Sequence, residues 1–251
     1  GSGGVSGQLL FYTGASTTGS SGKISIATGS AAGGQAGSII VSGGNGDYTT
    51  SGFVSMQAGS TSSATGTGGF FSVTSGAGTA KSSGLVVVRS ANAGTAGVSG
   101  SLQFKTGTTS DGSSGAVLIS TGSAAGTNGR TGSISLVAGV SAAGTGGDII
   151  AVGGTATATT GGLLSLTSGA GTASSSGSIF LRSMNAGVNG VSGSLSFSSG
   201  TTSSGSSGMI KLASGTASGK SGDVIVSSGT GAAGTGGTIA WSGGDSTAET
   251  G

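Results

Sequence analysis

The sequence contains no cysteine, no histidine and no proline, and each absence excludes a class of structure or chemistry. Without cysteine the chain forms no disulfide bond and no thiolate metal site. Without histidine, no nucleophile is activated by an imidazole base. Because proline is confined to sheet edges and bulges, its absence is what we expect of a chain in which every strand is central.

Charge is also scarce: charged residues make up 6% of the 251 residues, and the net charge is +2. No apolar run approaches the roughly 18 residues that a membrane-spanning helix needs. We therefore expect neither a nucleic-acid partner nor a membrane span. The basic residues stand singly and form no stripe that would follow a phosphate backbone, at Lys23, Lys81, Arg89, Lys105, Arg130, Arg182, Lys211 and Lys220.

Glycine, in contrast, is abundant, and sixteen of the 60 glycines open the same pattern of any, apolar, any, apolar, any and small residue. We number each unit from this glycine as position 0. The spacing between successive units is 14 to 17 residues and most often 15. A fixed short period indicates a repeat architecture. The sixteen glycines are Gly7, Gly22, Gly37, Gly52, Gly69, Gly84, Gly100, Gly115, Gly132, Gly147, Gly162, Gly177, Gly193, Gly208, Gly222 and Gly237.

Two positions of every unit carry the apolar residues. Position +2 is occupied by Leu9, Ile24, Ile39, Val54, Phe71, Val86, Leu102, Val117, Ile134, Ile149, Leu164, Ile179, Leu195, Ile210, Val224 and Ile239. Position +4 is occupied by Phe11, Ile26, Val41, Met56, Val73, Val88, Phe104, Ile119, Leu136, Ala151, Leu166, Leu181, Phe197, Leu212, Val226 and Trp241. Alternation with period two predicts a short strand with one buried face.

One strand of about six residues cannot bury that face alone, whereas stacked identical units can. We therefore predict an all-β fold, a parallel β-solenoid of sixteen repeats of about 15 residues that forms one continuous domain over residues 1–251. Position +9 is always small, which favours an inward position against the apolar ladder. One, two or three units per coil, or about 15, 30 or 46 residues, stay open as alternatives.

A longer period overlies the short one, because Gly4-Val5-Ser6-Gly7 recurs at Gly97–Gly100 and at Gly190–Gly193, 93 residues apart each time. This period predicts superrepeats of six units over 4–96 and 97–189 and an incomplete third over 190–251. The chain begins without methionine or a signal peptide, and neither end has an atypical polar repeat. We therefore expect an excerpt of a longer array.

Motifs that carry chemistry occur only in weak forms. Ser20–Lys23 is a Ser-x-x-Lys match in a chain rich in serine, and Gly215–Ser221 lacks one residue of the phosphate-binding loop. Gly43–Asp47 is similar to a calcium-binding nonapeptide but occurs once, where calcium needs six or more oxygen ligands. The carboxylates are dispersed, at Asp47, Asp111, Asp148, Asp223, Asp245 and Glu249. We expect no catalytic, cofactor-binding or metal site, and no enzyme.

The repeat Gly-x-Ile/Leu/Val-x-Ile/Leu/Val-x-Ser/Gly resembles giant surface-displayed β-solenoid proteins of the filamentous-haemagglutinin class, at the level of the pattern. The resemblance implies secretion, length and surface attachment, and it carries no functional residue. The expected function is that of a structural protein of an extracellular fibre, sheath or appendage, with other copies of itself as partner. The alternative is an adhesin stalk or binding module with surface or carbohydrate contacts, and an ice-binding solenoid fits less well because the outward positions are irregular. Apolar residues at those positions, such as Leu10, Ile40 and Phe180, favour lateral packing of one copy on another.

Overall fold

The computed structural model describes residues 6–47, 50–125, 129–232 and 234–244, and within these ranges the chain forms neither a helix nor a β-strand. The predicted all-β parallel β-solenoid is therefore wrong for the described chain. The reason lies in the difference between an extended segment and a strand. Alternating side chains require only extended backbone, whereas a strand also requires a neighbour that pairs with its N–H and C=O groups.

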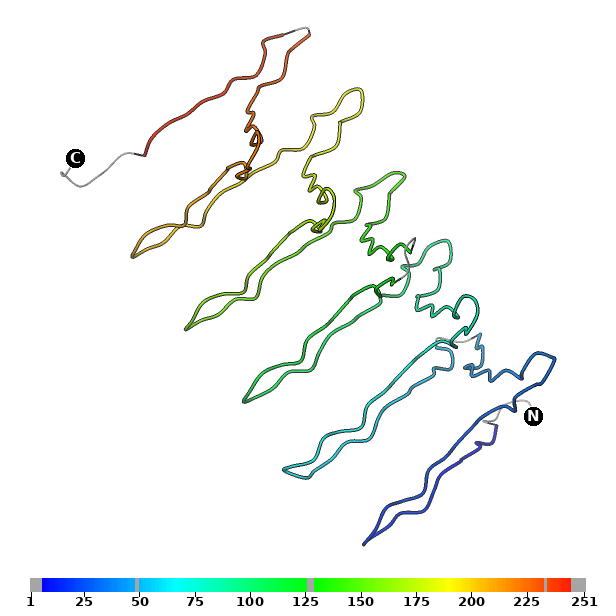
Figure 1. Ribbon diagram of the computed structural model, residues 1–251. Helices are drawn as coiled ribbons and strands as arrows, with labels where there is room; N and C mark the ends of the chain where they lie inside the picture. Colours follow the sequence, from blue (N-terminus) through cyan, green and yellow to red (C-terminus); the bar gives the residue numbers. More distant parts are fainter. Residues whose placement is uncertain (1–5, 48–49, 126–128, 233, 245–251) are drawn as a thin grey trace. The chain divides into compact units, whose positions relative to one another are not determined.

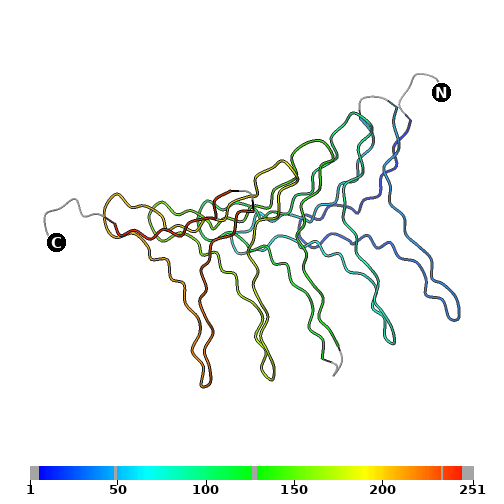
Figure 2. The same cartoon turned by 90° about the horizontal axis from the view of Figure 1, so that it is seen from above.

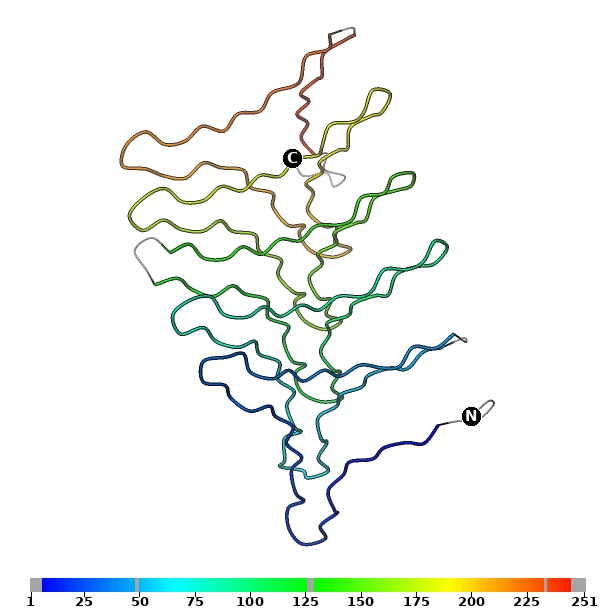
Figure 3. The same ribbon diagram turned by 90° about the vertical axis from the view of Figure 1, so that its right-hand side faces the viewer.

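The chain divides into two structural units, Gly1–Ser120 and Thr121–Gly251. In each of them the chain doubles back at one connection after another (Figure 1). The turns are visible from two further directions in Figure 2 and Figure 3. Bends and turns lie at the tips of the connections, for example at 17–19, 32–34 and 142–144, and none lies in positions 0 to +6. We call positions 0 to +6 the segment and the residues between two segments the connection.

Each connection is closed at its base by a facing pair of small residues, because the residue at +6 lies against the glycine that opens the next segment. A Cβ placed on Gly37 would lie 3.2 Å from the Cβ of Thr28, and a Cβ on Gly147 would lie 3.3 Å from that of Ala138. The same two positions face each other at all fifteen connections. Consecutive segments therefore run in opposite directions where they meet, which is the second respect in which the parallel prediction is wrong.

Hydrogen bonds hold this base together. In seven connections the N–H of the opening glycine donates to the carbonyl of position +7, as from Gly162 to Gly154 at 2.8 Å. In two other connections a threonine hydroxyl at +6 forms the bond instead: Thr13 Oγ1 donates to the carbonyl of Gly22 and Thr28 Oγ1 to that of Gly37, each at 3.0 Å. The four least exposed residues of the described chain all occupy +6, and they are Ala58, Ser75, Ala138 and Gly153. The glycine at 0 and the small residue at +6 are thus required by the same close approach.

The tips of the connections are shaped by the residue at +9, which is exposed and does not face inward as predicted. The Oγ of Ser141 accepts a hydrogen bond from the N–H of Gly144 at 2.8 Å. The hydroxyl of Thr109 donates to the carbonyl of Asp111 at 2.8 Å. A short hydroxyl side chain that bonds to backbone two or three residues further on stabilises a turn. Position +9 is small because it belongs to the turn.

The 93-residue period also appears in local geometry. Thr202 is the counterpart of Thr109, and its hydroxyl donates to the carbonyl of Ser204 at 3.1 Å. Gly112 and Gly205, again 93 residues apart, have φ angles of 105° and 115°, a region that favours glycine. These two equivalent connections, one in each structural unit, therefore take the same turn. The segment Gly4–Val5 that marks the first superrepeat lies outside the described residues.

Candidate functional site

The sequence motifs that resemble catalytic and phosphate-binding sites do not gather reactive groups. Lys220 Nζ lies 3.9 Å from Asp223 Oδ2, and both side chains are largely exposed. Exposed pairs of this kind contribute little to stability, about 1 kcal/mol or less. No helix follows Gly215–Ser221 within the described ranges, so the arrangement that holds a phosphate in such loops is not formed there.

The glycines of Gly43–Asp47 have a structural role in the loop base. A Cβ on Gly43 would lie 2.8 Å from the carbonyl oxygen of Gly52, and the N–H of Gly52 donates to the carbonyl of Gly44 at 3.1 Å. Among the described residues, no three acidic side chains lie close enough to hold a metal ion. Asp245 and Glu249 lie outside the described residues.

The feature that repeats in every unit is the apolar face, by which we mean the side chains at +2 and +4. The +2 side chains retain 46–62% of their exposure, apart from Leu9 at 80%. Large apolar side chains at +1, +3 and +5 are more exposed, at 64–90%. At +4 the large apolar side chains retain 50–82% of their exposure, a range that overlaps that of the odd positions. The predicted alternation is therefore visible at +2, where the side chains are partly covered, and not at +4.

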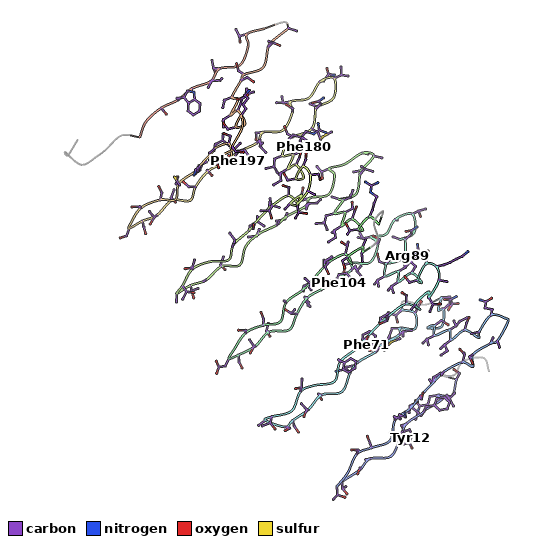
Figure 4. All side chains as sticks on the ribbon, viewed as in Figure 1. Tyr12, Phe71, Arg89, Phe104, Phe180 and Phe197 are labelled. Carbon is purple, nitrogen blue, oxygen red and sulfur yellow. The ribbon has the colours of Figure 1, made fainter. Side chains whose placement is uncertain are left out.

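No side chain is buried in the described chain, even on the covered side. Aromatic side chains project from the chain with no packed interior around them in both structural units, at Tyr12, Phe71 and Phe104 in the first and at Phe180 and Phe197 in the second (Figure 4). This is unusual for a chain in which 33% of residues are hydrophobic. Large exposed apolar surfaces are typical of sites that bind another molecule.

The total exposed area of the chain shows how little of its surface is buried. The chain exposes 24548 Å², whereas a compact monomer of its mass would expose about 9,500 Å² and the unfolded chain about 33,000 Å². The chain therefore keeps roughly three quarters of the surface of an unfolded polypeptide. Intramolecular packing therefore buries about a third of the area that a folded protein of this size normally buries.

The backbone is as open as the side chains. Ten backbone–backbone hydrogen bonds join described residues, and all of them lie in the connections or at their bases. A globular chain forms roughly one hydrogen bond per residue, about two-thirds of them between backbone groups. Positions +1 to +5 thus take part in no backbone–backbone bond within the described ranges. Such segments are templates for pairing with another extended chain.

Sequence reasoning located the apolar positions but missed both contacts that shape the connections. The signal for the facing pair was present, because +6 is always Ser, Thr, Ala or Gly directly before a connection and Gly follows it. The signal for the turn was the recurrent hydroxyl at +9, as in Ser16, Thr61 and Thr109. The signal at +9 was interpreted as an inward position, because the predicted coil had an interior and the described chain has none.

The described residues include no helix with the length and apolar character needed to cross a bilayer. None of the family models, curated proteins and solved structures compared with the chain matches it.

Proposed function

We propose that this chain is a self-associating structural protein, whose copies build an extracellular fibre, sheath or appendage. The observation that carries the proposal is the apolar face: it recurs in sixteen units, and none of its described side chains is buried by the chain itself. Burial of apolar surface contributes about 25 cal/mol per Å², so a partner that covers this face binds with a large driving force.

The low charge of the chain indicates which partner fits. A net charge of +2, carried by singly placed residues, provides no electrostatic complement to a nucleic acid or an anionic surface. The partner must instead present apolar side chains at intervals of about 15 residues over a long distance. Another copy of the same chain meets that requirement at every unit.

The size of the exposed surface favours an open-ended assembly. A standard protein interface buries about 800 Å² on each partner. The area that this chain exposes in excess of a compact monomer is about 15,000 Å², far more than one such interface covers. A copy with neighbours on two sides covers more of it than a copy in a closed pair. The extracellular setting of the proposal rests on the resemblance of the repeat to surface-displayed proteins.

Analytical sedimentation over a range of concentrations, followed by electron microscopy of the pelleted material, tests the proposal. We expect the chain to pellet above a critical concentration and the pellet to consist of filaments or sheets. A chain that stays monomeric at every concentration would overturn the proposal and favour the alternative of a binding module, whose apolar face meets a different molecule.

A further inference from the structure

We propose that neighbouring copies associate in parallel and in register, so that each segment pairs with the same segment of the next copy and each apolar side chain stacks on its own counterpart. This inference rests on the proposed self-association and specifies its geometry.

The backbone groups of each segment are free to pair with a neighbour, because the N–H and C=O groups of positions +1 to +5 form no backbone–backbone bond in the described chain. The neighbour on an extended segment must satisfy these groups as well as cover the side chains. A second extended segment does both, at a separation of about 4.8 Å. Each copy therefore presents two open edges at every segment, and each edge accepts one further copy.

Two neighbouring copies could be shifted along each other by a single residue. In a paired extended segment, such a shift moves every side chain to the opposite face. Such a shift would place the +2 side chain of one copy beside the +3 side chain of the next, for example Ile39 beside Ile40. At Ile39 and Ile40 the two faces already differ in the isolated chain, with exposures of 53% and 86%. A shift by one residue pairs unlike faces and is therefore disfavoured.

Two neighbouring copies could also be shifted along each other by one or more whole repeat units. The fifteen spacings between opening glycines are 15, 15, 15, 17, 15, 16, 15, 17, 15, 15, 15, 16, 15, 14 and 15 residues. A shift by one unit sets connections of different length beside one another, and even a shift by six units sets 17 beside 15 at two places within the first superrepeat. Only the unshifted register places every connection beside one of equal length and equal turn.

The direction of the neighbour follows from the difference between the two apolar columns. Position +4 carries an aromatic residue in four units, at Phe11, Phe104, Phe197 and Trp241, whereas position +2 carries one, Phe71. An antiparallel neighbour centred on +3 pairs +2 with +4 and reverses the order of the spacings, so that 17 meets 16 and 15 meets 14. A parallel neighbour keeps both columns uniform and matches all spacings.

Stacking in register also brings like charges together, because Arg89 lies beside Arg89 and Lys105 beside Lys105. Like charges that face each other across paired segments are destabilising. With 6% charged residues placed singly, the number of such contacts is small. The low charge of the sequence is therefore a condition for this geometry.

Trp241, the one tryptophan of the chain, tests the register in the unmodified protein. Protein made with carbonyl-¹³C tryptophan and pelleted as assembled material gives the distance between identical atoms of neighbouring copies by dipolar recoupling. In register, the label-to-label distance is about 4.8 Å. Dilution with unlabelled chain is the control, since it must remove the effect.

A second site is provided by single-cysteine variants, which are clean probes because the chain has no cysteine of its own. Ser72 and Ser165 both occupy +3 and lie 93 residues apart. When S72C and S165C are assembled together and oxidised, we expect disulfides between like residues. Cross-links between 72 and 165 would instead indicate a shift by one superrepeat and overturn the inference.

The outcomes separate the two proposals. If the wild-type chain never pellets, the proposed function and this inference fail together. If it pellets but the Trp241 labels show no short distance, only the register is wrong. If the cysteine variants fail to assemble, the labelled wild-type chain still decides, because it contains no substitution.

Discussion

The neighbouring residues Ile39 and Ile40 offer a matched test of the apolar face, because they have the same side chain on opposite sides of one segment. Ile39 retains 53% of its exposure and Ile40 retains 86%. Full burial of an isoleucine stabilises a protein by about 1.5–3 kcal/mol. Roughly half of that remains to be gained at Ile39 on association, so Ile39→Ser costs about 1 kcal/mol for each copy added.

A loss of about 1 kcal/mol raises the critical concentration for assembly about fivefold. The assay is the concentration of chain left in the supernatant after assembled material has been pelleted at equilibrium. In the control variant Ile40→Ser the lost side chain also stacks on its counterpart, but its outer side stays open to solvent, so we expect a smaller rise in critical concentration than for Ile39→Ser, together with weaker bundling of filaments in micrographs. Equal critical concentrations for the two variants, or a larger rise for Ile40→Ser, would refute the assignment of the apolar face.

Three further predictions concern the loop base, the charges and the tryptophan. In Gly162→Ala the new Cβ would lie 2.8 Å from the backbone nitrogen of Gly154 and would break the bond between these residues, whereas Gly154→Ala meets nothing within 4 Å. Loss of one hydrogen bond costs about 1 kcal/mol, so we expect Gly162→Ala to raise the critical concentration about fivefold. Gly154→Ala should leave the critical concentration unchanged or lower it. Equal effects of the two variants in the pelleting assay would contradict the close contact at the base of the connection. Salt should lower the critical concentration of the wild-type chain, because it screens the like charges that register brings together; a rise with salt between about 0.05 and 0.5 M would indicate attraction between unlike charges instead. Trp241 is 82% exposed, so its fluorescence should shift to shorter wavelength as the chain assembles, and emission unchanged across the critical concentration would place this side chain outside the interface.

The sequence located the apolar positions of each segment, whereas the predicted strand with a buried face and the predicted long-range pairing were both wrong. Side chains at +2, such as Ile134 and Ile239, are more covered than the large apolar side chains at the odd positions of most segments, as alternation with period two requires. The period itself recurs as a regular series of closed connections. These properties depend on residues within one unit and its immediate neighbour, and the sequence specifies them directly.

Sheet formation does not depend on one unit alone, and here the prediction was wrong. The parallel solenoid required segment n to lie beside segment n+1 in the same direction, which needs a connection that crosses over. The connections of this chain instead fold back, because Gly162 and its counterparts approach the preceding +6 residue closely, and in seven connections the glycine also bonds to the carbonyl of +7. Glycine at both bonded positions allows this close approach. A repeat pattern alone does not distinguish a connection that crosses over to a parallel neighbour from a connection that folds back.

The sequence predicted which residues form the apolar face, but it did not predict that these residues are exposed. The sequence identified the apolar columns, but it also assigned them to an interior, so their exposure was unexpected. Composition contains the explanation. Connections of glycine, serine and threonine are flexible, and fixing each residue costs about 1–2 kcal/mol of backbone entropy. A segment with two residues on the apolar face, such as Val117 and Ile119, cannot offset that cost for itself and its connection without a neighbour.

In the proposed assembly, this balance makes order in the segments a property of the stack and not of one chain. Each segment has two edges, and covering one of them satisfies half of its free backbone groups and part of its apolar face. A copy added to the end of an existing stack gains cover at all sixteen segments at once, whereas two copies that meet in solution must order both chains for the same gain. The first contact is therefore unfavourable and later ones are favourable, as in the nucleation of other cooperative structures. The repetition of one short unit sixteen times serves this end: it multiplies a contact that is too weak to order a single segment into one that orders the whole chain.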